Sequence, residues 1–588
     1  MLETTSAPLD YFSLIKQAKR LSAESCRATL KIALLADCST QQLVPLLKTL
    51  FHKNGIHAEI YEAEYDTIEL EVFNKLSKFY SFGADLVVIL NSANALRANY
   101  YAHPADKQTF LEETLRTITG IWDEIRAKTD APILQSTYVL PHERLFGNYD
   151  LKVPTALLTT AQALNQKIAE ASRLRASILI NDLDHIAAYQ GRKTWSDERL
   201  WIMGKYLCAL EHLPRVAQNI VEIALSLRGA GLKCIVLDLD NTLWGGIIGE
   251  DGLEGIRIGE LGEGEAFTLF QRFLLELKRR GILLAVCSKN DPQNALRPFR
   301  EHPEMVLKEA DIAVFVANWK NKAENIRQIR DILNIGLDSM LFLDDDPFER
   351  NLVRQYLPDI RVPELPEDPA NYVKALCELN LFETTSLSEL DEQRTQIIQQ
   401  DAQRLAVKEQ FSDIQDYLKS LDMKITLARF DPYHLPRIAQ LIQRSNQFNL
   451  TTKRYSQAEC GRFMKEEASW FPFYLSLKDK FGDSGLISVV ILKVAGRQIL
   501  IDEWIMSCRV LLRGVEQYAM NFIAGHAQKM GCSEIIGEYN PTPKNGMVKE
   551  FYRQFGFEPV SATPEGWTVW RLLAADYKPK TTFFKEEG

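Results

Sequence analysis

Short apolar runs alternate with longer amphipathic stretches through most of the chain. In the first block, which extends to residue 195, these runs begin at Lys31, His57, Asp85, Pro132 and Ser177. The segments between them, such as STQQLVPLLKTLFHKNG, place apolar residues at helical spacing. Strands that alternate with helices form parallel sheets covered by helices, so residues 1–195 are predicted to be a doubly wound α/β domain.

The same alternation returns after a helical connector, which we place at residues 196–230. Each apolar run there precedes a segment with helical periodicity, and the runs begin at Lys233, Leu283, Ile312 and Met340. This pattern predicts a second doubly wound α/β domain over residues 231–368, which ends in the proline-rich segment PELPEDP.

The last third of the chain has a different pattern. A charged helical connector over residues 369–423 leads to segments of alternating apolar and polar residues, among them LISVVILKV and QILIDEWIM. One helical segment, EQYAMNFIAGHAQKMG, follows them. Residues 424–588 are therefore predicted to form an α+β domain.

Composition narrows the class of protein. The 588 residues are too many for a single hydrophobic core, which agrees with three domains. A net charge of −9 without a long basic tract disfavours nucleic acid as a partner. No apolar run approaches the ~20 residues that span a bilayer, so no membrane partner is expected. The N-terminus lacks a signal-peptide pattern, and the nine scattered cysteines lack metal-finger spacing, so we expect a cytoplasmic protein.

Two carboxylates, Asp238 and Asp240, directly follow the first apolar run of the second block, in the sequence DLDNT that also contains Thr242. Parallel α/β sheets place their sites at the carboxyl ends of their strands. A strand buried on both faces does not end in two carboxylates without a cation or a hydrogen-bond network to hold them.

Polar residues also follow the other three strands of this block. Ser288 ends the second strand, and Lys320 and Lys322 follow the third, while Asp344 and Asp345 follow the fourth. We favour Lys322 over Lys320 because it opens a helix. Ordinary capping roles would explain any one of these residues, but a phosphate site explains all of them in this order.

Chemistry suggests a role for each group. A carboxylate can attack phosphorus when a cation neutralises the repulsion between the anions, and Mg²⁺ prefers such oxygen ligands. Asp238 is the predicted nucleophile, and Asp240 the general acid and base. Thr242, Ser288 and Lys322 are predicted to bind the phosphate. The predicted Mg²⁺ ligands are Asp238, Asp240, Asp344 and Asp345.

This order of motifs resembles the haloacid dehalogenase (HAD) superfamily. The segments DLDNTLWGGIIGEDG, NWKNKAENI and LFLDDDPFER are similar to the FkbH-like family of that superfamily. The resemblance implies a HAD-like Rossmannoid domain, Mg²⁺ as cofactor, and a glyceryl group loaded from 1,3-bisphosphoglycerate onto an acyl carrier protein in polyketide biosynthesis. Only about twenty residues separate Thr242 from the helix near Glu265, which is too few for a large cap domain.

In the third block, Cys508 lies in a loop between a predicted strand and a predicted helix, with Arg509 and Arg513 beside it. Guanidinium groups and the N–H groups of a helix start form an anion site that favours a thiolate, and Arg509 and Arg513 are also predicted to bind the acyl or pantetheine group. We therefore expect Cys508 to carry the acyl group as a thioester, and the alternative is a small buried side chain. Its base is His526 or a residue from elsewhere in the fold.

This third block resembles the acetyltransferase (GNAT) fold that binds coenzyme A. Glu516 stands where that fold has a small residue beside the pyrophosphate, so we infer the phosphopantetheine arm of a carrier protein instead of free coenzyme A. A polar segment either lines a hydroxyacyl pocket or forms a well-bonded loop, and both interpretations stay open. Its residues are Asn446, Gln447, Asn449 and Thr451.

The first block is distantly similar to SGNH hydrolases through Asp37-Cys38-Ser39 and the segment from Asp182 to His185. In this alignment Cys38 replaces the nucleophilic serine. We favour a hydrolase fold kept as a scaffold or docking domain, and the alternative is a second transfer or editing site.

The leading hypothesis is thus a bifunctional glyceryl transferase and phosphatase that uses the Asp238 site and Cys508. The main alternative is a Mg²⁺-dependent phosphatase of a small phosphorylated metabolite, whose flanking domains only bind a partner. A carrier-protein docking scaffold without catalysis is the least favoured hypothesis.

Overall fold

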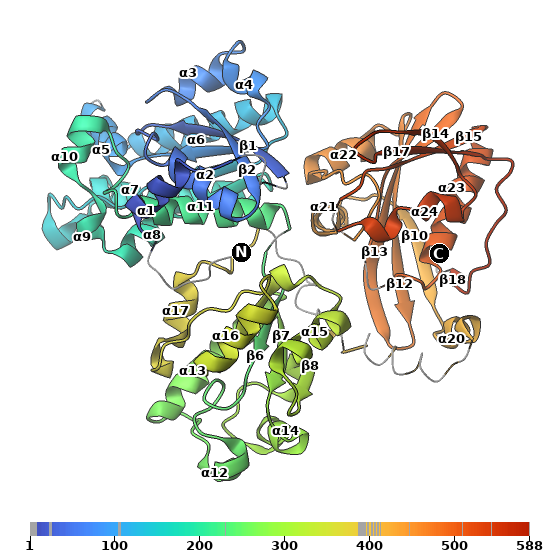
Figure 1. Ribbon diagram of the computed structural model, residues 1–588. Helices are drawn as coiled ribbons and strands as arrows, with labels where there is room; N and C mark the ends of the chain where they lie inside the picture. The colour runs from blue at the N-terminus through green and yellow to red at the C-terminus, as the bar shows by residue number, and fades with distance from the viewer. Residues whose placement is uncertain are drawn as a thin grey trace. The chain divides into compact units, whose positions relative to one another are not determined.

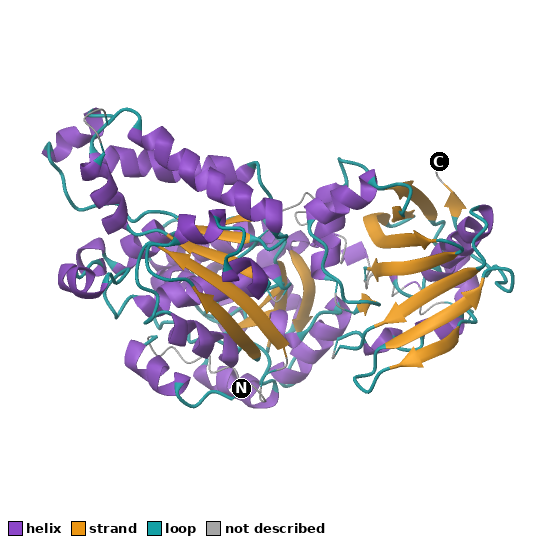
Figure 2. Cartoon of the chain, turned by 90° about the horizontal axis from the view of Figure 1, so that it is seen from above, coloured by secondary structure: helices purple, strands orange, loops and turns teal. Residues whose placement is uncertain are grey.

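The computed structural model places most of the chain in two compact units, Met1–Ser226 and Leu227–Gly588. Three β-sheets are formed within the residues that the structure describes (Figures 1 and 2). No helix among them is both long and apolar enough to cross a membrane. The described residues are 9–22, 26, 28–103, 107–229, 231–385, 395–396, 399–400, 404, 407, 411, 413–445, 447–507, 510–542 and 544–586.

The first unit contains a parallel five-stranded sheet in the order β2-β1-β3-β4-β5. Every residue of the central strand β3 is buried, because helices cover both faces of the sheet. The predicted parallel α/β architecture of this block is confirmed. The strands are β1 (Ala28–Ala36), β2 (Ile56–Glu62), β3 (Leu86–Leu90), β4 (Ile133–Ser136) and β5 (Ile178–Asn181).

The helices of this unit continue past residue 195, where we placed the end of the first domain. The last of them, α11, buries one apolar face within the unit, including Val216, Ile220 and Ala224. The segment predicted as a connector is therefore largely part of the first unit. The helices are α1 (Tyr11–Ala18), α2 (Val44–Lys53), α3 (Ile68–Phe73), α4 (Lys78–Phe82), α5 (Ala93–Ala102), α6 (Phe110–Lys128), α7 (Leu157–Arg173), α8 (Leu183–Gln190), α9 (Arg192–Trp195), α10 (Glu198–Gly204) and α11 (Leu213–Leu227).

The second unit begins with a parallel four-stranded sheet in the order β8-β7-β6-β9. Along β6, Ile235 and Leu237 face one apolar core, whereas Cys234 and Val236 face another. Burial on both faces explains why these strands are continuous apolar runs in the sequence. The strands are β6 (Cys234–Leu237), β7 (Leu283–Ser288), β8 (Ile312–Ala317) and β9 (Met340–Leu343).

Helices connect these strands, as the periodicity predicted. The segment between β6 and the long helix α13 holds only α12, so no cap domain is inserted there. The helices are α12 (Ile248–Gly255), α13 (Glu263–Arg279), α14 (Pro292–Glu301), α15 (Lys322–Leu333), α16 (Pro347–Tyr356) and α17 (Tyr372–Glu378).

The rest of the second unit is built on a mainly antiparallel sheet in the order β16-β17-β15-β14-β13-β12-β10-β18. β14 and β15 are parallel but pair only from Gln498 to Ile501 on β14, which then continues and pairs with β11. The strands are β10 (Lys424–Arg429), β11 (Phe448–Asn449), β12 (Trp470–Asp479), β13 (Gly482–Ala495), β14 (Gln498–Met506), β15 (Glu534–Tyr539), β16 (Glu558–Ala562), β17 (Thr568–Leu573) and β18 (Lys585–Glu586).

Helices accompany this sheet, and the strand and the helix predicted on either side of residue 508 are found. β14 ends at Met506 and α23 begins at Val515. The apolar side of α23 packs into the core of the sheet through residues that include Met520 and Ile523. The helices are α20 (Ile414–Ser420), α21 (Leu435–Arg444), α22 (Gln457–Lys465), α23 (Val515–Lys529) and α24 (Phe551–Gln554).

Candidate active site

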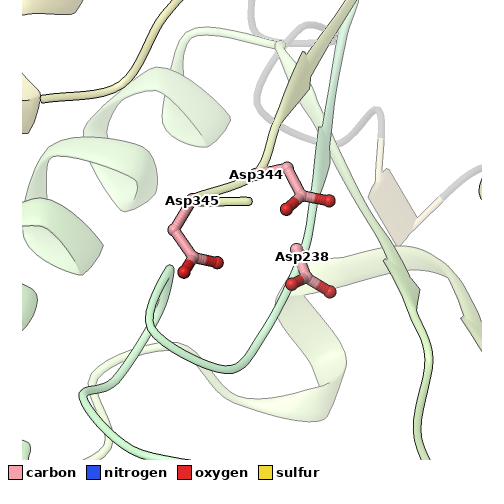
Figure 3. A group of neighbouring side chains, drawn as sticks. All are labelled: Asp238, Asp344 and Asp345. Atoms are coloured by element: carbon pink, nitrogen blue, oxygen red, sulfur yellow. The ribbon is translucent and has the colours of Figure 1, made fainter. Parts of the chain in front are cut away.

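Three carboxylates converge at the carboxyl edge of the four-stranded parallel sheet (Figure 3). Asp238 follows β6, and Asp344 and Asp345 follow β9, which pairs with β6. One oxygen from each carboxylate lies within 4.8 Å of the others. The neighbouring strands bring together residues that are about a hundred positions apart in the sequence.

Lys322, from the first turn of α15, lies against this group. Its Nζ is 3.0 Å from Asp238 Oδ1 and 2.5 Å from Asp344 Oδ2, and the side chain is buried. Burial by itself lowers the pKa of Lys322, but the two aspartates raise that pKa by more. Lys322 therefore stays a cation, whereas Lys320 is exposed.

The negative charges of Asp238, Asp344 and Asp345 repel one another because these carboxylates lie close together. Burial, and then the charge of Asp238, raises the pKa of Asp344 to about 7 and the pKa of Asp345 to about 6. Asp238 Oδ1 is buried and accepts no well-directed hydrogen bond within the described chain, although it is close to Lys322. Converging oxygen ligands with an unsatisfied buried atom fit a hard divalent cation such as Mg²⁺.

The carboxylate of Asp240 is not part of this group. Its Oδ1 accepts hydrogen bonds from Trp244 Nε1 and the backbone N–H of Ile248, both at 3.0 Å. Its Oδ2 accepts a hydrogen bond from Asn290 Nδ2 at 2.7 Å. The structure thus does not bring the Asp240 side chain to the predicted metal group, and its role as acid and base stays a prediction.

Two buried hydroxyl groups lie at the same edge. Thr242 Oγ1 accepts a hydrogen bond from the backbone N–H of Asp345 at 3.2 Å, which links the loops after β6 and β9. Ser288, the last residue of β7, accepts a long hydrogen bond of 3.4 Å from Asn290 Nδ2. Both are placed as the sequence predicted, and their binding of phosphate stays a prediction.

Sequence analysis missed a residue that holds the backbone of Asp344 and Asp345 in place. Arg350, on α16, donates hydrogen bonds of 2.7 Å to the backbone carbonyls of both Asp344 and Asp345. It is buried and also pairs with Glu364 at 2.7 Å. Nothing in the sequence distinguishes Arg350 from a surface arginine of an amphipathic helix, because its partners come from the tertiary fold.

The turn after β6 has a second support that was missed. Asn241 adopts a left-handed conformation with φ of 52°, and its carbonyl accepts a hydrogen bond of 3.0 Å from the hydroxyl of Tyr372. Tyr372 packs in the core against Phe267 and Phe270. The aromatic core thus holds the turn that joins Asp240 to Thr242.

Three of the residues predicted for acyl transfer, Cys508, Arg509 and Asn446, lie outside the described residues. Gln447 is partly exposed, whereas Asn449 and Thr451 are buried.

The buried side chains of Asn449 and Thr451 form hydrogen bonds within their own domain. Thr451 Oγ1 bonds to the backbone carbonyl of Asp502 at 3.0 Å and to Glu503 Oε2 at 2.8 Å. Asn449 Oδ1 accepts a hydrogen bond of 2.6 Å from the backbone N–H of Thr452. For this pair, the structure favours the well-bonded loop over the acyl pocket.

The loop before α23 is also built from internal contacts. Arg513 is buried and lies 3.4 Å from Asp479. Glu516 accepts a hydrogen bond from the backbone N–H of Leu512, and burial raises the pKa of its carboxyl. His526 stacks on Phe522 and contacts Phe471 in an aromatic cluster. The role of Arg513 as an acyl or pantetheine ligand stays a prediction.

The catalytic alternative for the first unit is not supported by its geometry. Cys38 is buried, and burial followed by the charge of Asp37 raises the pKa of its thiol. His185 is exposed and stacks on Tyr189. A buried neutral thiol is a poor nucleophile, so the scaffold interpretation is favoured.

Comparison with known proteins agrees with this geometry. The family model described as "FkbH, N-terminal domain" matches residues 31–225. A crystal structure of the N-terminal part of the protein BF1531 from Bacteroides fragilis, containing a phosphatase domain complexed with Mg, is 38% identical, with a TM-score of 0.62. The match covers 64% of this chain and 100% of the BF1531 chain.

Two acetyltransferases match a smaller part of the chain. The ribosomal-protein-S18-alanine N-acetyltransferase from Escherichia coli is 14% identical, with a TM-score of 0.21, over 26% of this chain and 94% of that chain. Spermidine N-acetyltransferase from Vibrio cholerae, in complex with CoA and spermine, is 15% identical, with a TM-score of 0.21. This match covers 26% of this chain and 96% of that chain. No curated protein matches the chain. From the family model and the BF1531 relative, the chain belongs to the FkbH-like family of the haloacid dehalogenase superfamily.

Proposed function

We propose that this chain is a phosphatase coupled to a glyceryl transferase, which converts 1,3-bisphosphoglycerate into a glyceryl thioester on an acyl carrier protein. The observation that supports it most is the group formed by Asp238, Asp344 and Asp345 with Lys322 against it. The similarity to a phosphatase domain that binds Mg, in the BF1531 protein, supports the phosphatase half.

In the phosphatase half, an oxygen of Asp238 attacks phosphorus, and the bond from phosphorus to the leaving oxygen breaks. Asp240 gives a proton to that leaving oxygen and later takes one from the water that hydrolyses the aspartyl phosphate. Lys322 offsets the charge that develops on the phosphoryl oxygens. Asp238, Asp344 and Asp345 would hold Mg²⁺, which supplies positive charge opposite the phosphoryl group.

In the transferase half, the thiolate of Cys508 attacks the carbonyl carbon of the acyl phosphate and phosphate leaves. The pantetheine thiolate of the carrier protein then attacks the new thioester, and Cys508 is released. This half is supported by membership of the FkbH-like family and by the position of Cys508 between β14 and α23. Cys508 itself lies outside the described residues.

A second function is favoured by one observation. Asn449, Thr451 and Arg513, predicted for the acyl site, make hydrogen bonds and ion pairs within their own domain. A Mg²⁺-dependent phosphatase of a small phosphorylated metabolite, with flanking domains that only bind partners, has no need of an acyl site there.

Intact-mass spectrometry separates the two functions. The chain is incubated with Mg²⁺, 1,3-bisphosphoglycerate and a carrier protein that bears its pantetheine arm. The coupled enzyme acquires a glyceryl adduct that is lost in Cys508→Ala but kept in Cys377→Ala, which changes an exposed cysteine. Phosphate release without a glyceryl adduct on either the chain or the carrier protein would establish the phosphatase alone and overturn the coupled scheme.

The phosphatase half has its own matched control. Asp238→Asn is expected to stop hydrolysis of the phosphomonoester, whereas Asp291→Asn should not, because Asp291 is an exposed helix cap that asparagine can replace. Equal loss in both variants would show a general effect on folding, and full activity of Asp238→Asn would overturn the proposed nucleophile.

A further inference from the structure

The first unit contains a cavity of about 490 Å³ that the proposed function does not use. It is formed by the first turn of α5, the loop after β4, α7 and the start of α9, which Figure 1 shows in the blue-green part of the chain. Its inner wall includes the buried apolar side chains of Val139 and Leu158.

Four cationic side chains line this cavity, namely Arg97, Arg144, Arg192 and Lys193. Arg97 is paired with Glu143 at 3.1 Å and Glu198 at 3.5 Å, and Arg192 is paired with Asp184 at 2.8 Å.

The other two cations are not neutralised in this way. Arg144 donates a hydrogen bond to the neutral side chain of Asn148, and Lys193 forms no ion pair with any residue in the described part of the chain. The positive charges of Arg144 and Lys193 are therefore available to a ligand, because the nearby carboxylates pair with Arg97 and Arg192.

The helix α5 adds to the positive field. Its first residues, Ala93 and Asn94, line the cavity, and Ser92 caps the helix by accepting a hydrogen bond from the backbone N–H of Ala95. The N-terminus of a ten-residue helix attracts anions through its free N–H groups and its dipole.

The loop that supplies Arg144 also carries apolar side chains to solvent. More than half of the surface of each is exposed, although Leu151 also lines the cavity. Several exposed apolar residues in one short loop are typical of a binding surface. They are Leu145, Phe146, Tyr149 and Leu151.

We propose that this cavity binds a phosphate ester with a partly apolar stem. Arg144 and Lys193 face the phosphate, and the wall formed by Val139 and Leu158 receives the stem. The phosphopantetheine arm of a carrier protein has this chemistry, and so does a free phosphorylated metabolite. Only the choice of the arm as the source rests on the proposed function.

Calorimetric titration of the full-length chain tests the site. The Asp238→Asn variant is used without Mg²⁺, so that turnover plays no part and failure of the proposed catalysis leaves the test intact. The probes are 4′-phosphopantetheine, 3-phosphoglycerate and inorganic phosphate. We expect Arg144→Glu/Lys193→Glu to weaken binding of at least one ester by tenfold or more.

The control is Lys48→Glu/Arg116→Glu, which makes the same change of charge on exposed positions of α2 and α6. Weakening in the cavity variant alone supports the site. Tighter binding of phosphopantetheine identifies the arm, and tighter binding of 3-phosphoglycerate identifies a metabolite. Equal effects of both variants, or no effect of either, would overturn the proposal. Inorganic phosphate that binds as tightly as both esters would overturn the role of the stem.

Discussion

The two parallel sheets of this chain each carry an aspartate just after their first strand, at Asp37 and at Asp238. Asp37 is satisfied by its surroundings, since it accepts hydrogen bonds from the backbone N–H of Ser92 at 2.7 Å and from Asn91 Nδ2 at 3.1 Å. Asp238 instead faces Asp344 and Lys322, and its Oδ1 lacks a well-directed donor in the described chain.

This difference shows why position alone does not define a site. Both aspartates are buried at the carboxyl edge of a parallel sheet, where α/β proteins bind ligands. The environment of Asp37 is complete, so a ligand would have to break hydrogen bonds there. The environment of Asp238 concentrates negative charge that a cation can relieve, so the physical argument for chemistry favours Asp238 over Asp37.

The largest effect is expected from exchanging the two aspartates for asparagine. Asp238→Asn removes the nucleophile and should lower kcat for hydrolysis of the phosphomonoester by at least about 10³-fold. Asp37→Asn loses one buried hydrogen bond, so it should cost about 1–3 kcal/mol of stability with kcat changed by less than about threefold. Steady-state phosphate release and chemical unfolding measure the two effects. Equal losses of kcat in Asp238→Asn and Asp37→Asn would contradict the proposed difference between the two sites.

Lys322→Met should have the next largest effect. It removes the ammonium group between Asp238 and Asp344, so kcat should fall by about 10²–10³-fold. The Mg²⁺-free protein should lose about 3–5 kcal/mol of stability, because breaking a buried ion pair leaves uncompensated charge. Lys320→Met is the matched control on the exposed lysine. Urea unfolding with and without Mg²⁺ should show that the ion recovers part of the loss in Lys322→Met, and a loss that Mg²⁺ does not change would contradict this arrangement.

The pH dependence of Mg²⁺ binding tests the charge cluster itself. Without metal, Asp344 and Asp345 have pKa values of about 7 and about 6, so protons compete with Mg²⁺ below neutral pH. Affinity should therefore rise as pH increases from 5.5 to 7.5, by about tenfold or more. Calorimetric titration measures it. In Asp238→Asn the rise should shift to lower pH, because a neighbouring charge is gone, and a flat profile in the parent chain would refute the cluster.

The smallest effect on phosphate chemistry is expected from a buried carboxyl in the mainly antiparallel sheet. Burial raises the pKa of Glu503 to about 7, although Thr451 and the backbone N–H of Trp504 bond to it. Because this pKa is raised on folding, the stabilising contribution is full below about pH 4.5 and is lost as pH rises through 7. Glu503→Gln should flatten this component, which is at most about 3 kcal/mol. Unfolding between pH 4.5 and 8 measures it, with kcat for phosphate release unchanged. A slope that survives in Glu503→Gln would assign it to another group.

Much of the parallel architecture could be predicted because its strands are buried on both faces and read as apolar runs. The sheet of the third block was harder. β16 is exposed at every position and β11 has two residues, so neither leaves a hydrophobic pattern. Their pairing depends on contacts far along the chain, such as that of β11 with the end of β14.

The site was predicted where strand ends determine it and missed where the tertiary fold does. Asp238, Asp344, Asp345 and Lys322 follow directly from strand ends and a helix start. Asp240 was predicted as a metal ligand because it closely follows the same strand as Asp238. β6 ends at Leu237, and in the turn beyond it the carboxylate of Asp240 bonds to Trp244, Ile248 and Asn290 instead. Arg350 acts through backbone carbonyls and has no signature in the sequence.

The most direct test of the central claim is chemical trapping of the phosphorylated enzyme. Borohydride reduces an aspartyl phosphate to homoserine, which peptide mass spectrometry can locate after a single turnover with Mg²⁺ and 1,3-bisphosphoglycerate. The account predicts homoserine at position 238, lost when Lys322 is replaced by Met. Turnover without reduction at that position, or reduction at position 37 instead, would contradict it.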